Sequence, residues 1–251
     1  MRDAPFSLDR LSDVPRFVYL NSYMAKIDDK SGYDDVLLDD DSRQFFGFKW
    51  RGWYLVNATL PFGWKISPFV YQTIGMGVTS FFRECGLPCS LYIDDRLNGE
   101  IFTPSGRWSR PPDQRDDEFS FQVATAALHI VVLVLVQLGY FLGVKKCVLR
   151  PLKCLTYLGM IVDSSLQSFL IPEDKKIKFE QLRNKILTFK AMVPVRELQR
   201  MMGKCISFSL AFPGRSFTFG KCQGQLVERG MLPKFLIFLR TFAKRFDSGN
   251  S

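Results

Sequence analysis

The apolar positions up to about residue 171 come in short runs typical of strands. Residues 45–56 are aromatic and rich in β-formers, and Arg51-Gly52 within them is a turn signal, so this segment predicts a hairpin. Two further apolar runs, at 25–29 and 90–95, end abruptly in adjacent aspartates. We expect the first to be a strand that ends in carboxylates, and the second to begin a hairpin with its acids at the turn.

Beyond Pro172 the pattern changes to charged, amphipathic helices. The segment Pro172-Glu173-Asp174 predicts a helix start, and the apolar stripe that follows consists of Ile177, Leu182, Ile186 and Phe189. After Pro194 a second helix is expected, with an apolar face made of Leu198, Met201, Met202 and Cys205. A third, apolar and basic helix is predicted over about 232–246. The whole pattern predicts an α+β protein whose last portion is all-helical.

The stretch 119–144 carries no charged residue and is long enough to cross a membrane. Polar side chains interrupt it at Gln122, Thr125, His129 and Gln137, and its β-branched run suits a helix buried in a protein core equally well. On the residues alone, both a membrane span and a buried helix stay open. The segment 99–118 before it is rich in Pro, Gly, Ser, Arg and Asp, which predicts an exposed loop.

The composition narrows the class of protein. The 251 residues are 47% hydrophobic, 14% aromatic and 24% charged, which excludes an intrinsically disordered chain. The net charge of +9 is uneven, because residues 1–100 carry 11 basic and 14 acidic side chains, whereas residues 101–251 carry 23 and 11. An acidic first part and a basic second part fit a chain that binds cations in one region and a polyanion in the other, although the same balance also serves solubility.

The cysteines and the histidine exclude several kinds of site. The start MRDAPFSLDR mixes charges of both signs and lacks an apolar run, so we expect no secretory signal and six reduced cysteines. One histidine excludes zinc sites of the Cys2His2 and His-triad kinds. The spacings Cys85-x3-Cys89 and Cys147-x6-Cys154 favour ordinary buried thiols over zinc ligands.

The aspartates at the two strand ends are the candidates for chemistry. Adjacent aspartates at a turn are most often structural. If Asp28-Asp29 and Asp94-Asp95 converge on one point, however, their carboxylate oxygens form a hard-oxygen site suited to Mg²⁺. Two such ions can activate a hydroxyl, stabilise a leaving oxygen and clamp a phosphoryl group, which is the chemistry of polymerases and nucleases.

The order of five motifs resembles the palm of reverse transcriptases. The motifs are Lys26-Ile27-Asp28 through Tyr33, Leu60-Pro61-Phe62-Gly63-Trp64-Lys65-Ile66-Ser67-Pro68, Tyr92-Ile93-Asp94-Asp95, Leu138-Gly139-Tyr140 with Lys145-Lys146-Cys147, and Tyr157-Leu158-Gly159. The resemblance covers about residues 17–171, and the remainder is similar to a thumb. The segment Val195-Arg196-Glu197-Leu198-Gln199 with Gly203-Lys204 is most similar to retrotransposon enzymes of the DIRS-like or Ty3-like kind.

The resemblance implies a fold and a domain layout. The fold would be α+β, with a polymerase palm of antiparallel sheet and packed helices followed by an all-helical thumb. Residues 1–171 would form the palm with residual fingers, and residues 172–251 the thumb. Residues 119–139 would be a palm helix packed beneath the sheet, which favours the buried helix over the membrane span.

The resemblance also assigns catalytic roles. Asp28 and Asp94 would be the carboxylates that bridge two Mg²⁺ ions, or Mn²⁺ in their place, and Asp95 would be a less essential metal ligand beside them. Lys146, or Lys145 in its place, would protonate the leaving pyrophosphate. A solvated pair of surface lysines is the alternative interpretation of these two residues.

Further roles concern nucleotide and primer. The resemblance places Asp29, Tyr33, Phe62 and Gly63 at the nucleotide, with the Asp29 backbone carbonyl as a further metal ligand and the Tyr33 ring as a steric gate against a 2′-hydroxyl. Without the motif, Tyr33 would be a core aromatic. A primer grip is implied for the hairpin residues Tyr157, Leu158 and Gly159. Contacts to the nucleic-acid backbone are implied for Arg196, Arg200 and Lys204.

The implied function is RNA-directed DNA polymerase, a nucleotidyltransferase that transfers a deoxynucleotide to a primer 3′-hydroxyl in a two-metal reaction. The implied partners are an RNA or DNA template with its primer, deoxynucleoside triphosphates and other parts of a retroelement polyprotein. We expect an intracellular protein, in the cytoplasm or nucleus, without stable membrane association. Two alternatives stay open, namely a catalytically impaired remnant that binds nucleic acid and a single-span membrane protein with a basic tail.

Three features depart from the family pattern. Only 27 residues precede Asp28, where the family has its fingers, so we expect either a fragment of a longer polyprotein or a chain that has lost most of its fingers and binds nucleotide poorly. Asp29 and Arg96 each stand where the family usually has an apolar residue. We expect Asp29 to add repulsion to Asp28, and Arg96 to form an ion pair with Asp95 and draw it away from the metal.

Overall fold

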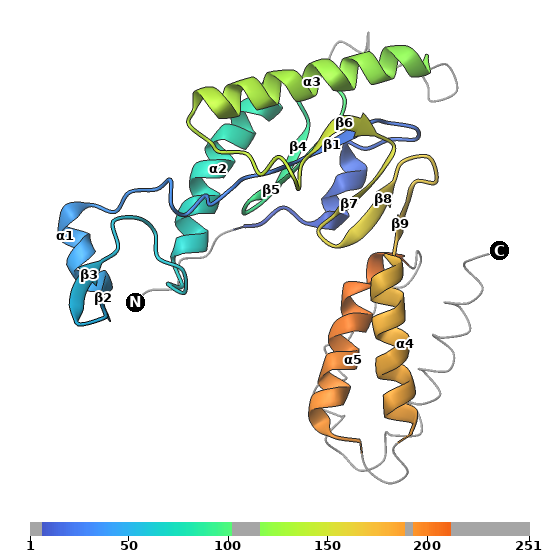
Figure 1. Ribbon diagram of the computed structural model, residues 1–251. Helices are drawn as coiled ribbons and strands as arrows, with labels where there is room; N and C mark the ends of the chain where they lie inside the picture. Colours follow the sequence, from blue (N-terminus) through green and yellow to red (C-terminus); the bar gives the residue numbers. More distant parts are fainter. Residues whose placement is uncertain (1–6, 102–115, 189–192, 212–251) are drawn as a thin grey trace. The chain divides into compact units, whose positions relative to one another are not determined.

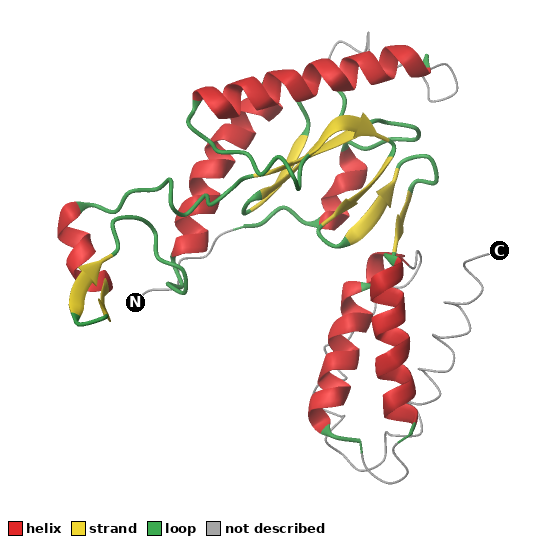
Figure 2. Ribbon diagram, in the orientation of Figure 1, coloured by secondary structure: helices red, strands yellow, loops and turns green. Residues whose placement is uncertain are grey.

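The computed structural model describes residues 7–101, 116–188 and 193–211. The chain divides into two compact units, of which the first ends at Leu170 and the second begins at Ile171. Figure 1 gives the course of the chain, and Figure 2 shows strands and helices together in the first unit and helices in the second. The third helix expected over 232–246 and most of the loop expected over 99–118 lie outside the described residues.

A four-stranded antiparallel sheet forms the centre of the first unit. It contains β1 (Met24–Asp28), β4 (Cys89–Tyr92), β5 (Asp95–Asn98) and β6 (Val148–Leu152) in the order β4-β5-β1-β6. β1 and β5 lie in the middle, and their register sets Asp28 opposite Asp95. The expected strand and the expected hairpin that end in aspartates are therefore both confirmed, as is the α+β class.

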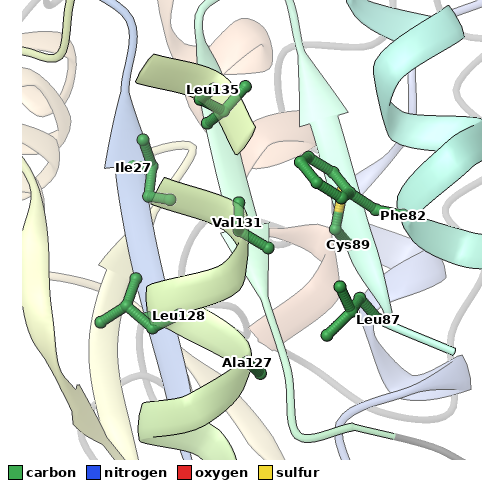
Figure 3. Close-up of a cluster of buried hydrophobic side chains, with 9 residues drawn as sticks. Ile27, Phe82, Leu87, Cys89, Ala127, Leu128, Val131 and Leu135 are labelled. Atoms are coloured by element: carbon green, nitrogen blue, oxygen red, sulfur yellow. The ribbon is translucent and has the colours of Figure 1, made fainter. Parts of the chain in front are cut away.

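Two long helices pack on the sheet. α2 (Ser67–Glu84) lies against β4, and α3 (Asp117–Gln137) lies against β1 and β6. Figure 3 shows their side chains gathered around the strand residues Ile27 and Cys89. The buried cluster consists of Ala25, Ile27, Phe82, Leu87, Cys89, Ala127, Leu128, Val131 and Leu135. This cluster is the apolar layer between α3 and the face of the sheet opposite the acids.

Helix α3 covers most of the apolar stretch 119–144, for which the residues alone left both a membrane span and a buried helix open. The Asp116 side chain caps it by accepting a hydrogen bond from the Glu118 amide at 3.2 Å. One stripe of the helix is buried in the cluster, while Ile130, Leu133 and Val136 are exposed. Among the described residues, α3 alone is long and apolar enough to cross a membrane, a test that core helices also pass. One face of α3 packs on the sheet, as the buried-helix interpretation expects, while 33% of its apolar window is buried.

Smaller elements flank the central sheet. The expected hairpin is confirmed as β2 (Gly47–Trp50) and β3 (Trp53–Val56), with a turn at Arg51-Gly52 in which both φ angles are positive. A second, three-stranded sheet contains β7 (Cys154–Tyr157), β8 (Met160–Asp163) and β9 (Ser168–Leu170). The short helices of this unit are η1 (Leu11–Arg16), α1 (Asp40–Arg43) and η2 (Gln44–Phe46).

The second unit contains α4 (Glu173–Leu187), α5 (Val195–Ser207) and η4 (Ser209–Ala211). Both helices begin directly after the prolines that predict their starts. The apolar face of α5 is buried as expected, but in α4 the side chain of Phe179 is buried and Ile177 is exposed. The expected stripe was wrong at this position because Phe179, Leu182 and Ile186 share one face at i, i+3 and i+7, whereas Ile177 lies five residues before Leu182 and turns away from that face. Phe179 also packs edge-on against the Phe208 ring, 5.7 Å away. Phe189, the last residue of the expected stripe, lies outside the described residues.

The core position of α3 makes a prediction for stability. We expect Leu128→Ala to lower the free energy of unfolding by about 2–5 kcal/mol, because it leaves a cavity in the buried cluster. Leu133→Ala on the same helix is the matched control, since Leu128 is 2% exposed and Leu133 is 61% exposed. Urea unfolding measures both. An equal loss in the two variants would mean that the outer stripe of α3 is covered as well.

Candidate active site

The ends of β1 and β5 bring the four aspartates together. Asp28 and Asp95 are directly paired across the two strands, and the Asp29 amide donates to the Asp94 carbonyl at 2.8 Å. Directly paired side chains of an antiparallel sheet lie on the same face, so Asp28 and Asp95 share one face. Asp94 stands in the turn beside them. Asp28, Asp94 and Asp95 are therefore neighbours where these two central strands end.

The turn that carries Asp94 is held from α2. Ile93 has a positive φ of 56°, a backbone conformation that a β-branched residue rarely adopts. Its amide donates to Gln72 Oε1 at 2.7 Å, and Gln72 Nε2 donates to the Leu91 carbonyl at 3.3 Å. Because Gln72 is buried in α2, it fixes the strained turn to the helix.

Asp28 is buried by residues that follow α3. The Gly143 amide donates to the Asp28 carbonyl at 2.7 Å, and a Cβ atom at Gly143 would lie 2.5 Å from Asp28 Oδ2. The Asp28 amide donates to Cys147 Sγ at 3.3 Å. Lys146 Nζ lies 3.4 Å from Asp28 Oδ2, with 72% of its side chain exposed. The glycine therefore leaves just enough room for the carboxylate, and the predicted proton donor lies beside it.

Asp94 carries a less stable negative charge than an isolated carboxylate. Partial desolvation of its carboxyl group is the main cause that raises its pKa, although the residue as a whole stays exposed. A backbone hydrogen bond lowers this pKa, the charges of Asp95 and Asp28 raise it, and Lys146 lowers it. Negative charge thus accumulates where Asp28, Asp94 and Asp95 meet.

The expected ion pair between Arg96 and Asp95 is wrong. Asp95 Oδ1 lies 2.8 Å from Lys26 Nζ, whereas Arg96 Nη2 lies 3.5 Å from Asp29 Oδ2. Successive side chains of a strand point to opposite faces of the sheet, so neighbours such as Asp95 and Arg96 cannot reach each other. Asp95 faces the acids, and Arg96 faces the helices.

Asp29 and Arg96 form a buried polar cluster on the helix face. Asp29 Oδ2 also accepts a hydrogen bond from Tyr71 Oη at 2.9 Å, and Arg96 Nη1 donates to Thr79 Oγ1 at 3.0 Å. The Arg96 guanidinium lies 5.3 Å from the centre of the Tyr140 ring. Burial raises the pKa of Asp29, while Arg96 and Tyr71 oppose the rise. The expected repulsion of Asp28 by Asp29 is thus reduced by this pairing.

The donor set at the strand ends fits a hard divalent cation. Asp28 and Asp94 offer carboxylate oxygens, which are the ligands that Mg²⁺ prefers. Within residues 7–101, 116–188 and 193–211, no three His, Cys, Asp or Glu residues form a ready metal-binding group. Asp95, the predicted third ligand, is held by Lys26. Metal binding by these three residues stays a prediction.

The predicted nucleotide residues Tyr33 and Phe62 contact each other. Their ring centroids are 5.0 Å apart, and the Tyr71 ring packs edge-on against Tyr33 at 5.6 Å. Burial and the charge of Asp94 raise the pKa of Tyr33, so this ring lies within the field of the carboxylates. Phe62 is 77% exposed, and Gly63 after it adopts a positive φ of 90° with open space where a Cβ would stand. Phe62 is therefore accessible to solvent beside the Tyr33 ring.

The predicted primer-grip residues form the turn between β7 and β8. Leu158 and Gly159 both have positive φ, as a two-residue hairpin turn requires. Tyr157 is fully buried, with its hydroxyl 3.2 Å from Ser90 Oγ and donating to the Asp95 carbonyl at 3.4 Å. The turn is therefore anchored to the backbone of β5 next to the acids.

A groove of about 810 Å³ opens beside this turn. Leu158 and Tyr92 line it together with the segment from Ser7 to Leu11. The three residues predicted to contact nucleic acid lie on α5 in the second unit, where Arg196 and Arg200 are exposed and Lys204 is half-buried. Arg200 Nη1 lies 3.4 Å from Glu197 Oε2, so this arginine is paired within α5.

Sequence reasoning missed four residues that hold this site. Tyr71 and Gln72 lie on α2, Gly143 and Cys147 follow α3, and each acts through a contact with a distant part of the chain. Cys147 adjoins the predicted Lys146, and this adjacency was its one local signal. Gln72 is a large polar side chain within a mostly apolar run of α2, and a polar side chain in such a run was a signal for an internal partner.

Comparisons with known proteins bear on this arrangement. The family profile described as "Reverse transcriptase (RNA-dependent DNA polymerase)" matches residues 18–162, more than half of the chain. No curated protein sequence matches.

Among solved structures, the chain is similar to the foamy viral protease-reverse transcriptase in complex with an RNA/DNA hybrid. The TM-score is 0.55, with 20% identity over 80% of this chain and 23% of that chain. The same viral protein in complex with double-stranded DNA gives a TM-score of 0.62, with 17% identity over 96% of this chain and 46% of that one. The chain thus spans less than half of either viral chain, and the likeness concerns the fold.

The charges around Asp94 predict its titration. We expect its pKa above the ordinary aspartate value, and a lower pKa in Asp95→Asn, because one of the two neighbouring negative charges is removed. A raised folded-state pKa means that Asp94 favours folding at low pH, and that this contribution is lost as pH rises through the folded pKa. Carboxyl-carbon NMR titration measures the shift.

Asp117 is the internal reference for this titration. A hydrogen bond from Lys153 is the main cause that lowers the pKa of Asp117, and this interaction does not involve Asp95. An unchanged pKa of Asp94 in Asp95→Asn would contradict the proximity of the two carboxylates.

Proposed function

Because the chain belongs to the reverse transcriptase family, we propose that it is an RNA-directed DNA polymerase that adds deoxynucleotides to a primer 3′-hydroxyl. The observation that carries the proposal is that Asp28 and Asp94 lie close together where the two central strands end, with Asp95 beside them. Carboxylates so placed suit two Mg²⁺ ions, or Mn²⁺, which when bound activate the hydroxyl and stabilise the leaving oxygen.

Individual residues of this chain would have separate roles in the reaction. Asp28 and Asp94 would hold the ions, and Asp95, which Lys26 pairs with in this structure, would be the less essential ligand beside them. Lys146, next to Asp28, gives a proton to the departing pyrophosphate. The Tyr33 ring excludes a 2′-hydroxyl, Phe62 and Gly63 receive the incoming base, and the Asp29 carbonyl completes the nucleotide site.

The primer is positioned by the turn of Tyr157, Leu158 and Gly159. The contact of Tyr157 with the Asp95 carbonyl links this turn to the carboxylate-bearing strand, so the 3′-hydroxyl would be set against the acids. The foamy viral structures hold an RNA/DNA hybrid or double-stranded DNA. We extend nucleic-acid binding from those proteins to this chain, with an RNA or DNA template, a primer and deoxynucleoside triphosphates as partners.

We further propose the layout and source implied by the motifs. The first unit acts as the palm with residual fingers, and the second as the thumb, whose α5 tracks duplex phosphates with Arg196, Arg200 and Lys204. The chain would work inside the cell, without stable membrane association, together with other parts of a polyprotein from a DIRS-like or Ty3-like retrotransposon.

A second candidate function is a nucleic-acid-binding remnant without catalysis. The two lysine contacts favour it, because Lys26 pairs with Asp95 at 2.8 Å and Lys146 with Asp28 at 3.4 Å. Cations at these positions partly neutralise the charge that a metal ion needs. The two functions predict different results in a primer-extension assay.

The polymerase proposal predicts metal-dependent extension. We expect the chain to extend a DNA primer on an RNA template with Mg²⁺ or Mn²⁺, and Asp94→Asn or Asp28→Asn to reduce the rate about 100-fold or more. Asp117→Asn, a carboxylate on the first turn of α3, is the matched control and should retain the rate. Duplex binding without any extension at either metal would leave the remnant as the function.

The proposed thumb predicts salt-dependent binding. Replacement of a phosphate-contacting arginine by glutamine reduces the slope of log affinity against log salt by about one. We expect this for Arg196→Gln and Arg200→Gln in fluorescence anisotropy with an RNA/DNA hybrid. Arg16→Gln, an exposed arginine of η1 in the first unit, serves as the control for a general loss of charge. Equal slopes in all variants would contradict the role of α5.

A further inference from the structure

We propose that the buried pair of Arg96 and Asp29 acts through Tyr71 to position the Tyr33 ring, and so sets the preference for deoxynucleotides over ribonucleotides. The inference rests on the proposed polymerase function and goes beyond it, because Arg96, Asp29 and Tyr71 are assigned as positioning residues. Their side chains do not touch the nucleotide, since the part of Asp29 proposed for the nucleotide site is its backbone carbonyl. Their effect on it would pass through ring contacts.

The burial of the pair shows that its geometry is constrained. The side chains of Arg96 and Asp29 are 0% and 1% exposed. Charges removed from water are costly unless they are paired and hydrogen-bonded, so neither side chain can leave the other cheaply. Thr79 accepts from Arg96 and Tyr71 donates to Asp29, and both of these partners lie on α2. The pair therefore fixes α2 to the ends of β1 and β5.

A chain of direct contacts leads from the pair to the nucleotide residues. Asp29 Oδ2 accepts from Tyr71 Oη at 2.9 Å, and the Tyr71 ring packs edge-on against Tyr33 at 5.6 Å with an interplanar angle of 70°. Tyr33 in turn packs against Phe62 at 5.0 Å. A Cβ atom at Gly32 would overlap the Tyr71 ring, so the backbone before Tyr33 is also seated on that ring. Tyr71 thus contacts Tyr33 through both its side chain and the preceding residue.

The hydrogen bond from Tyr71 to Asp29 gives the Arg96–Asp29 pair a role in positioning Tyr33 that is separate from its effect on the free energy of unfolding. In Arg96→Leu, the buried Asp29 carboxylate loses the guanidinium and turns toward water, which withdraws the acceptor of the Tyr71 hydroxyl. In the double variant Asp29→Leu with Arg96→Leu no charge is left buried, but the Tyr71 hydroxyl still lacks Asp29. Stability and the position of Tyr33 should therefore respond differently to the two sets of substitutions.

The first measurement is urea unfolding of the full chain. We expect the single variants Asp29→Leu and Arg96→Leu each to lower the urea concentration at the unfolding midpoint, because each leaves one unpaired buried charge. We expect the double variant to recover most of this loss, because it leaves no buried charge. Independent, additive losses in the double variant would overturn the coupling between the two residues.

The second measurement reports on Tyr33 without any need for catalysis. The protein is labelled with 3-fluorotyrosine, and the fluorine NMR signal of residue 33 is identified by its disappearance in Tyr33→Phe. We expect this signal to shift in Tyr71→Phe and in the double leucine variant, since both remove the hydrogen bond between Tyr71 and Asp29. Leu128→Ala is the control, because it destabilises the core without touching these residues. A signal unchanged in Tyr71→Phe and the double variant would overturn the positioning role.

The third measurement is the ratio of kcat/KM for a deoxynucleotide to that for the matching ribonucleotide. We expect Tyr71→Phe and the double leucine variant to lower this ratio about tenfold, equivalent to about 1.4 kcal/mol, and Leu128→Ala to leave it unchanged. A ratio at the wild-type value in both variants would overturn the specificity role. A wild-type chain that incorporates no nucleotide would overturn the proposed function and this specificity role, and the fluorine signal would still decide whether Asp29 and Tyr71 position Tyr33.

Discussion

The register between β1 and β5 is the constraint on which the rest of the site depends. With Asp28 opposite Asp95, Ile27 lies opposite Arg96, and strand alternation sends these two pairs to opposite faces of the sheet. Ile27 then reaches the core beneath α3, while Asp28 faces the other carboxylates. A slip of one residue would exchange the faces, burying Asp28 in the apolar cluster. The hydrophobic core and the acidic site are thus set by the same pairing.

The register also accounts for both charged departures from the family pattern. Asp29 and Arg96 follow the alternation onto the helix face, where an apolar residue would ordinarily pack. A single charge there would lie in a poorly solvated environment, but the two side chains meet at 3.5 Å and share partners on α2. Two substitutions that look like independent damage in the sequence therefore form one compensated feature in three dimensions.

Features encoded by local pattern could be predicted from the sequence. The paired aspartates at strand ends, the Arg51-Gly52 hairpin and the proline-started helices depend on neighbouring residues, and the structure contains them. Features that depend on distant partners could not. The salt bridge expected between Arg96 and Asp95 is absent because the side chains of sequence neighbours on a strand point to opposite faces. The partners of Gln72 and Tyr71 are Ile93 and Asp29, which lie beyond strand ends and far from α2 in the sequence. Ile177 was misplaced because its spacing of five residues from Leu182 does not fit one helical face, whereas Phe179, Leu182 and Ile186 do share a face.

Nearby cations offset the negative charges of the four aspartates to different extents. Asp29 is paired with Arg96 inside the protein, and Asp95 is paired with the mostly buried Lys26. Asp28 has Lys146 beside it, but that side chain is 72% exposed, so water and salt screen the pair strongly. Asp94 feels Asp28 and Asp95 as repulsive neighbours and stays exposed on one side. Asp28 and Asp94 are thus the two carboxylates whose charge is least offset by a buried cation, which agrees with their proposed role as ligands of a divalent cation.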